Sequence, residues 1–300
     1  MWAMFLYLTL FSLFMNTSVS EKVCISLLRK GYTIRSLSKR CFDIIARKGT
    51  SILLIKMLED ADSISREYAE QMLRIGKYLS ASPLIIAEKA GRKLDDFVVY
   101  TRFNIYTLNI LTFRNCIDNK LPFIKRDRAG LKAELIGTKV RQLREREGLS
   151  LNSLARKVGV SPRMISKYED GSSEITVCKA LKMYDLLGHE VFSKIDIFHT
   201  STHPEDVNSS FTKKYHDLGF EATETRKVPF SIIARKQDEI ILTEIGDSPD
   251  PHAESLAKLI DADNLVIFRK KRPKHVPGLT KKEFLELEEA GELVRFIKEF

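Results

Sequence analysis

An internal repeat limits the possible folds of this 300-residue chain more than any other feature of its sequence. Gly31–Lys56 aligns with Gly219–Glu244 without a gap, at a constant offset of 188 residues. The agreement is strongest between the strings CFDIIARK at residues 41–48 and PFSIIARK at residues 229–236. A chance match of this length at one offset is rare, so we infer that the chain contains a duplicated unit.

Each copy has the pattern of a β-hairpin followed by a helix, a strand and a strand that enters a helix. The hairpin strands are expected at Phe42–Arg47 and Ile52–Leu58, and at Phe230–Arg235 and Glu239–Glu244. The later elements are expected at Ser63–Leu79, Pro83–Ala87 and Ile105–Phe113, and at Pro251–Ile260, Asn264–Phe268 and Val276–Phe284. With a short helix before each copy, the order α-β-β-β-α-β-β occurs twice. It predicts an α/β fold with two small mixed sheets and flanking helices.

This order resembles the core of restriction-endonuclease-like nucleases and archaeal Holliday-junction resolvases. The resemblance implies a metal-binding Asp at the start of the hairpin and an acid-x-Lys motif on the next strand, which hold Mg²⁺ and stabilise developing charge. The first copy keeps Asp43 and Lys56, but Leu54 occupies the position of the second acid. The second copy has Ser231, Leu242 and Glu244 at the three positions.

One carboxylate cannot organise such a metal site. We therefore interpret both copies as restriction-endonuclease-like blocks that have no catalytic residue, metal ligand or cofactor and that serve dimerisation or auxiliary DNA contact. The alternative is a nuclease or resolvase-like enzyme targeted to DNA, in which Glu59 or Asp60 keeps the first copy active.

Between the copies, the apolar residues follow a helical period. Ile136, Val140 and Leu143 share one helix face. Gly148 suits the C′ position that ends this helix, and Ser150 is a good N-cap for the next one. These signals predict a compact helical unit rather than a continuation of the sheet.

The next two helices carry their own start and stop signals. Leu151, Leu154, Ala155 and Val158 form the apolar face of the first, and Gly159 makes the turn because a positive φ suits glycine. In the second, Ser161 is the N-cap and Pro162 occupies N1. Ile165 and Tyr168 point inward, Asp170-Gly171 ends the helix, and a fourth helix is expected at Ile175–Leu187.

The string LSLNSLARKVGVSPRMISKYEDG at residues 149–171 closely resembles the helix-turn-helix of Cro and the phage repressors. The resemblance implies that the helix at 161–169 enters the DNA major groove, with the motif spanning Ser150 to Asp170. Leu151 departs from the family, which often has Gln there, so phosphate contacts fall to neighbouring groups. The expected DNA-binding residues are Ser150, Asn152, Ser161, Pro162, Arg163, Ser166 and Lys167. Arg144 and Glu169 match positions that form a buried salt bridge in several phage repressors.

From about Glu21 to the C-terminus, the chain resembles archaeal proteins described as HTH-type transcriptional regulatory proteins. We therefore expect a first block at residues 21–125, an all-α helix-turn-helix domain at 130–192 and a second block at 205–300. The resemblance implies a sequence-specific, double-stranded DNA-binding transcriptional regulator without enzymatic activity. We expect it to be a cytoplasmic homodimer.

The charge distribution agrees with a polyanionic partner. The formal net charge is +9, and residues 114–182 hold 16 Lys and Arg against 8 Asp and Glu. The four cysteines, Cys24, Cys41, Cys116 and Cys178, lie far apart without a CxxC pair. This spacing argues against a zinc ribbon or a disulfide framework and predicts isolated buried thiols.

Residues Met1–Met15, MWAMFLYLTLFSLFM, are almost entirely apolar. They lack the basic start of a signal peptide, and the run is short for a membrane span. We interpret residues 1–20 as a start-site artefact and do not expect a membrane partner. The alternatives are a membrane anchor and a helix that packs on the rest of the protein.

Overall fold

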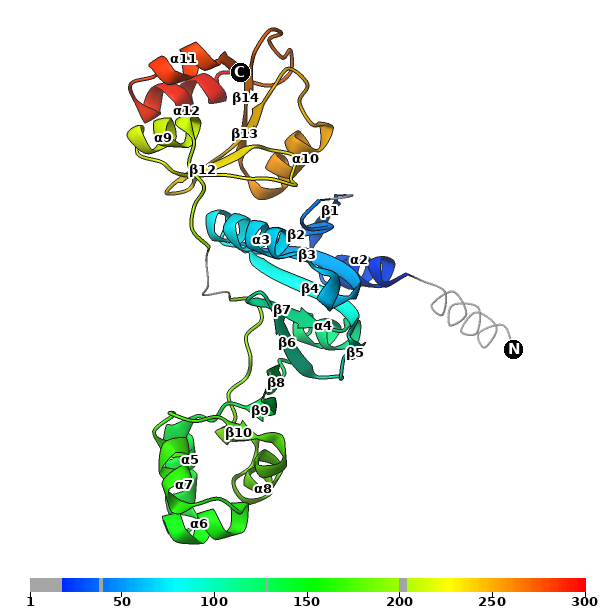
Figure 1. Ribbon diagram of the computed structural model, residues 1–300, viewed down its shortest axis with the longest axis vertical. Helices are drawn as coiled ribbons and strands as arrows, with labels where there is room; N and C mark the ends of the chain where they lie inside the picture. Colours follow the sequence, from blue (N-terminus) through cyan, green and yellow to red (C-terminus); the bar gives the residue numbers. More distant parts are fainter. Residues whose placement is uncertain (1–17, 38–39, 128, 200–203) are drawn as a thin grey trace, which may run out of the picture.

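The computed structural model describes residues 18–37, 40–127, 129–199 and 204–300. The apolar segment Met1–Met15 therefore lies outside the described residues. Within those residues, no helix is long and apolar enough to cross a membrane. Figure 1 shows the second block at one end of an elongated molecule, the first block in the middle and the helix-turn-helix helices at the other end.

The first block is a mixed sheet covered by helices on both faces. Strand order is β1-β2-β3-β4-β7, with antiparallel pairs from β1 to β3 and parallel pairs from β3 to β7. The middle strands β3 and β4 are apolar on both faces, which is typical of strands buried between helix layers. The elements are α2 (Val19–Arg29), β1 (Thr33–Ser36), β2 (Ile44–Lys48), β3 (Ser51–Asp60), the 3-10 helix η1 (Ala61–Ser63), α3 (Arg66–Leu79), β4 (Ser82–Ala90), β7 (Ile105–Leu108) and α4 (Ile110–Ile117).

The second block repeats this topology. Its sheet order is β11-β12-β13-β14-β15, with the same two antiparallel and two parallel pairs. The predicted order α-β-β-β-α-β-β is therefore confirmed in the second copy, whereas two further short strands lie between β4 and β7 in the first. The elements are α9 (Ser210–Asp217), β11 (Glu221–Glu224), β12 (Ile232–Lys236), β13 (Glu239–Ile245), α10 (Pro251–Ile260), β14 (Asp263–Phe268), β15 (Gly278–Thr280), α11 (Lys281–Glu286) and α12 (Ala290–Lys298).

Five short strands were not predicted. They are β5 (Arg92–Lys93), β6 (Val98–Arg102), β8 (Ile124–Asp127), β9 (Gly130–Ala133) and β10 (Ile175–Thr176). β6 lies between β7 and β8, so the first sheet continues through β9 to β10 in the helix-turn-helix region. The prediction of a helix at Ile175–Leu187 was wrong at its start. Ile175 is buried and pairs with Ala133 as part of strand β10, and the helix begins at Val177.

The two blocks contact each other through equivalent arginines. Arg47 Nη1 in β2 donates to the carbonyl oxygen of Leu259 near the end of α10, at 2.9 Å. Arg235 Nη1 in β12 donates to the carbonyl oxygen of Tyr78 near the end of α3, also at 2.9 Å. Arg47 and Arg235 occupy the same position of the repeat. Each block therefore holds the helix end of the other.

The contact is reciprocal beyond these two bonds. Arg47 also pairs with Asp261 and Arg235 with Ser80, and both partners are left-handed C-cap residues that end α10 and α3. One cluster of buried side chains contains residues of both blocks, among them Leu54 and Leu242. In a two-fold interface, residue i contacts residue j and residue j contacts residue i. The duplication thus builds a two-fold-like interface inside one chain.

The cysteines only partly agree with the expectation of buried thiols. Cys41 and Cys116 are buried, and burial raises the pKa of the Cys41 thiol to about 12. Cys24 is half-buried and Cys178 is exposed on the fourth helix of the helix-turn-helix region, so the expectation was wrong there. All four are free.

Candidate nucleic-acid interface

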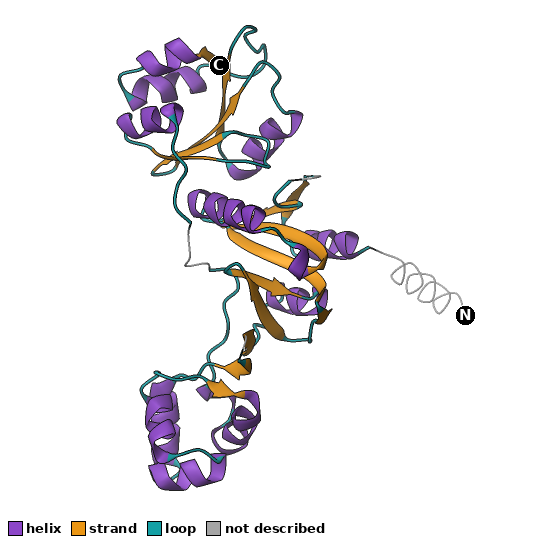
Figure 2. Ribbon diagram, viewed as in Figure 1, coloured by secondary structure: helices purple, strands orange, loops and turns teal. Residues whose placement is uncertain are grey.

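Four helices form a separate core between the two blocks in sequence. They are α5 (Gly137–Arg146), α6 (Leu151–Val158), α7 (Pro162–Glu169) and α8 (Val177–Leu187), followed by the 3-10 helix η2 (His189–Val191). The predicted inward residues Val140, Leu154, Val158, Ile165 and Tyr168 are buried in this core. Figure 2 shows the four helices at the lower end of the molecule, next to short strands.

The turn between α6 and α7 has the geometry that the sequence predicts. Ser150 Oγ accepts the backbone N–H of Ser153 at 3.1 Å and caps α6. Gly159 ends that helix with φ of +77°, a conformation that a side chain would strain. Ser161 Oγ accepts the N–H of Met164 at 3.3 Å, and Pro162 starts α7. These caps determine where each helix begins, and therefore which residues face outward.

The structure brings the expected DNA-binding residues to the surface. Ser150, Asn152, Ser161, Pro162, Arg163 and Lys167 are exposed, and Ser166 is half-buried. Ser166 Oγ donates to the carbonyl oxygen of Pro162 at 3.4 Å. Neither Arg163 nor Lys167 forms an ion pair within the described part of the chain. Both cations are therefore available to an external anion.

Two further cations lie beside the turn and were not predicted. A Cβ on Gly159 would meet Lys179 Nζ at 3.0 Å and Lys182 Nζ at 3.6 Å. Both lysines come from α8, at positions three residues apart on one helix face. Their spacing in the sequence was a usable signal, but only the fold shows that α8 delivers them to the α6–α7 turn.

A buried ion pair ties α7 to α5. Arg144 Nε donates to Glu169 Oε1 at 2.5 Å and Arg144 Nη2 to Glu169 Oε2 at 3.2 Å, so the predicted pair is confirmed. Burial disfavours the charged carboxylate, but hydrogen bonds from Arg144 and Arg141 outweigh it and lower the pKa of Glu169. Gly137 permits this approach, because a Cβ there would lie 2.2 Å from the carbonyl oxygen of Glu169.

At the nuclease-like position of the first block, both oxygens of the remaining carboxylate already accept hydrogen bonds from neighbouring residues. Asp43 Oδ1 accepts from Lys56 Nζ at 2.9 Å, and Asp43 Oδ2 accepts from the N–H of Met57 at 2.8 Å. Leu54, at the position of the second acid, is fully buried. The side chains present do not fit a divalent cation, because a buried aliphatic group replaces the second carboxylate.

Glu59 and Asp60 do not supply the missing carboxylate. Both lie at the far end of β3, and Asp60 is four residues beyond Lys56, about 13 Å along an extended strand. Glu59 pairs with Lys89, and Asp60 Oδ1 accepts the N–H groups of Asp62 and Gly91. Their oxygens are engaged away from Asp43.

At the position of Lys56, the second block holds a buried acid, Glu244. Glu244 is buried and accepts the backbone N–H of Asp250, while Ser231 stands where the first block has Asp43. Burial raises the pKa of Glu244 to about 7, and the nearby negative charge of Asp250 adds to this effect. Leu242 is fully buried, as Leu54 is. With Ser231 and Leu242, the second block has no carboxylate at either acid position of the motif.

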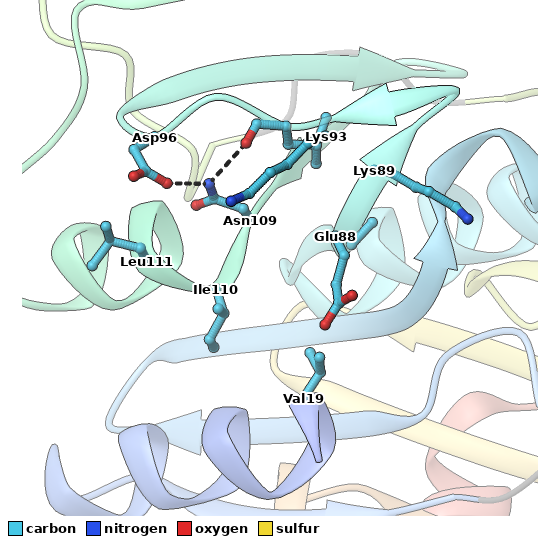
Figure 3. A pocket seen from close by; sticks show the side chains of 10 residues that line it. Val19, Glu88, Lys89, Lys93, Asp96, Asn109, Ile110 and Leu111 are labelled. Carbon is cyan, nitrogen blue, oxygen red and sulfur yellow. Dashed lines mark hydrogen bonds between the residues drawn. The ribbon is translucent and has the colours of Figure 1, made fainter. Parts of the chain in front are cut away.

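A pocket of about 530 Å³ is lined by residues of the first block and by none of the α6–α7 turn. Figure 3 shows Glu88 pointing toward Val19 and shows Asn109 bound to Asp96. Asn109 Nδ2 donates to Asp96 Oδ1 at 2.6 Å and to the carbonyl oxygen of Leu94 at 3.3 Å. These polar groups satisfy one another, and the pocket adds nothing to the helix-turn-helix surface.

Comparison with known proteins agrees with this geometry. Residues 140–188 match a family model described as helix-turn-helix, and residues 16–122 match one described as a PD-(D/E)XK superfamily domain. The fold therefore defines a helix-turn-helix protein that also carries a nuclease-like domain.

Full-length relatives make the assignment more specific. A "Putative HTH-type transcriptional regulatory protein" of Methanocaldococcus jannaschii is 30% identical and covers 92% of this chain and 94% of its own. Relatives with the same description from Archaeoglobus fulgidus and Thermococcus kodakarensis are 29% and 30% identical, covering 95% and 89% of this chain and 98% and 91% of their own. The chain belongs to this family of archaeal proteins. Among solved structures, the restriction-modification controller protein C.AhdI from Aeromonas hydrophila is 29% identical over 17% of this chain and 77% of its own, with a TM-score of 0.17.

Proposed function

We propose that this protein is a sequence-specific, double-stranded DNA-binding transcriptional regulator that places α7 in the major groove. The observation that carries the proposal is the capped α6–α7 pair, whose outer face presents Arg163 and Lys167 without partners in the described residues. The names of the archaeal relatives support the regulatory role. We also propose the division into units at 21–125, 130–192 and 205–300, and action in the cytoplasm.

The seven exposed or half-exposed residues divide into two roles. Arg163 and Lys167 lie one turn apart on α7, and Arg is the commonest bidentate partner of guanine O6 and N7. Ser161, Pro162 and Ser166 flank them on the same helix. Ser150 and Asn152 lie at the start of α6, where free backbone N–H groups favour a phosphate.

The test is Arg163→Ala, measured on DNA selected from a random duplex library. Losing a base contact costs about 1–3 kcal/mol of binding and relaxes the preference at one base pair of each half-site. Lys194→Ala is the matched control, because it removes one exposed positive charge from a segment away from α7. If Arg163→Ala weakens operator and random duplex equally, Arg163 contacts the backbone, and base readout falls to Lys167 and Ser166.

We propose that the chain acts as a homodimer, because such motifs read two half-sites about 34 Å apart. The faces that join the two blocks are already occupied within one chain. A second copy therefore needs another surface, and α8 exposes Leu181 and Tyr184, at 62% and 52%. Sedimentation should give a dimer at micromolar concentration that Leu181→Asp dissociates. A wild-type monomer that binds its operator tightly contradicts this proposal.

We infer that neither block is an enzyme. A buried leucine at both acid positions supports this inference. The competing function, a nuclease or resolvase targeted by the helix-turn-helix, requires a carboxylate at the position that Leu54 and Leu242 occupy.

A further inference from the structure

The connection between β14 and β15 in the second block is a loop dense in positive charge. Five cations occur within six positions, and all five side chains are exposed: Arg269, Lys270, Lys271, Arg272 and Lys274. None of them forms an ion pair within the residues that the structure describes. We call residues 269–274 the basic loop.

The start of the basic loop is held by one carboxylate. Asp247 Oδ1 accepts the backbone N–H groups of Arg269 and Lys270 at 2.8 Å and of Lys271 at 3.2 Å. The bonds from Lys270, Arg269 and Lys271 lower the pKa of the Asp247 carboxyl, so it is ionised at neutral pH. Because these hydrogen bonds come from main-chain N–H groups, they leave the side-chain donors of the three residues unused.

The end of the loop is anchored by packing. A Cβ on Gly278 would lie 2.6 Å from Pro273 Cδ, so the proline ring packs directly on the start of β15. The N–H of Val266 also donates to the carbonyl oxygen of Pro277 at 2.9 Å. A loop anchored on both sides presents its cations at defined positions, unlike a mobile charged tail.

The second block segregates its charge. Residues 205–300 contain 16 Lys and Arg against 19 Asp and Glu, and five of those 16 cations lie in the basic loop. Without the loop, the same region has 11 basic against 19 acidic residues. A polyanion is therefore attracted to the loop and repelled by the rest of the block, which orients the contact.

We propose that the basic loop binds phosphates of duplex DNA that flanks the site held by α7. This inference rests on the proposed DNA-binding function. Figure 1 shows the connection after β14 at the opposite end of the molecule from α6 and α7, so the contact falls on DNA outside the operator. An anionic membrane fits less well, because residues 269–275, RKKRPKH, contain no large apolar side chain to enter a bilayer.

The experiment compares two triple variants of the full chain. In K270Q/K271Q/R272Q the loop loses three charges but keeps every N–H bonded to Asp247. The matched control, K213Q/K258Q/K282Q, removes three exposed charges elsewhere in the second block. Affinity is measured at 50 and 200 mM KCl on the operator alone and on the operator with long flanks.

On the flanked duplex, each lost phosphate contact lowers the salt slope by about 0.9, so three lower it by about 2.7. The wild-type affinity then falls about 40-fold more over this salt range than that of the loop variant. The control should follow the wild type. On the operator alone all three proteins should agree, and base preference should be unchanged throughout.

Equal slopes for the loop variant and the control on flanked DNA overturn the inference, as does an equal loss on both duplexes. A loop variant that loses binding only to phosphatidylserine vesicles assigns the loop to a membrane instead. In each of these results an Arg163-dependent operator preference leaves the proposed function standing. A wild-type protein that binds no duplex removes both.

Discussion

The two blocks share one framework but differ in what connects the fourth strand to the fifth. In the first block this connection, residues 91–104, carries β5 and β6 and extends the sheet toward the helix-turn-helix region. In the second, residues 269–277 form a short connection that includes the basic loop. The shared strands bury apolar side chains and the connections lie on the surface. Packing therefore limits change in the shared strands, whereas the surface connections can acquire new contacts.

The blocks also differ at the nuclease-like position. The first holds an ion pair between Lys56 and the half-buried Asp43, whereas the second has Glu244 and Ser231, and Glu244 forms no ion pair within the described residues. Each block therefore carries the energetic cost of a partly or fully buried carboxylate, which Lys56 offsets in the first block.

The largest loss of stability should come from breaking the ion pair of the helix-turn-helix region, and the losses in the two blocks can be compared with it. The side chains of Arg144 and Glu169 are only 11% and 4% exposed. Glu169→Ala removes the buried carboxylate that accepts two hydrogen bonds from the Arg144 guanidinium and should cost about 3–5 kcal/mol of unfolding free energy. Glu145→Ala, which removes an exposed partner of the same arginine, should cost less than about 1 kcal/mol. Thermal unfolding measures both, and an unchanged midpoint for Glu169→Ala contradicts the pairing.

Lys56→Met should have the next largest effect, because the half-buried Asp43 then loses its cation. Asp43 is 21% exposed, so we expect about 3 kcal/mol, the lower end for a broken buried pair. The double variant Asp43→Asn with Lys56→Met removes the stranded charge and should recover part of that loss. Denaturant unfolding measures both variants. If the single and double variants are equally destabilised, lost packing rather than stranded charge explains the effect.

Glu244→Gln should stabilise the protein, and only at high pH. The folded pKa, about 7, exceeds the ordinary value of 4.5, so the folded state binds more protons between these values than the unfolded state. Wild-type stability therefore falls as pH rises from about 4.5 to 7, by about 2–3 kcal/mol from this group, and then levels off. The variant lacks this decline, and its advantage should be absent at pH 4 and full at pH 8. Parallel stability curves for the two proteins across this range would show that Glu244 is not the titrating group.

The repeat made the framework of both blocks predictable, because the matching strings cover both hairpins and the glycines before them. The same strings contain Arg47 and Arg235, yet their partners could not be predicted. Those partners are the carbonyl oxygens of Leu259 and Tyr78, and every residue has a carbonyl. Sequence comparison identifies side chains, whereas the acceptors in this interface are backbone carbonyl oxygens at helix ends.

The helix-turn-helix was predictable from its caps, since serine, proline and glycine each meet a local backbone requirement. The short strands were not, because two to five residues give too little periodicity to count. Ile175 shows the difference. Its β-branched side chain is compatible with a helix or a strand, and it lies in a strand because it pairs with Ala133.

Arg47→Ala and Arg235→Ala test whether the interface is reciprocal. Each variant frees a helix-end carbonyl of the other block and should cost about 1–2 kcal/mol, since hydrogen bonds from charged donors exceed neutral ones. The two losses should be similar because the arginines occupy the same repeat position. Arg114→Ala, an exposed arginine at the end of α4, is the control. A large loss from one arginine and none from the other would show that the interface is one-sided.

The smallest expected effect is none at all, for divalent metal on DNA. Branched or linear duplex incubated with the protein and Mg²⁺ or Mn²⁺ should stay intact, because Leu54 and Leu242 replace the carboxylates that an attacking water would need nearby. Asp43→Ala should behave like the wild type in the same assay, since its carboxylate serves Lys56 and Met57 rather than a metal. Nicking that requires metal and disappears in Asp43→Ala would show that the first block is catalytic, unlike the second. Nicking that survives in Asp43→Ala would indicate a contaminating nuclease, which purification of the variant alongside the wild type identifies.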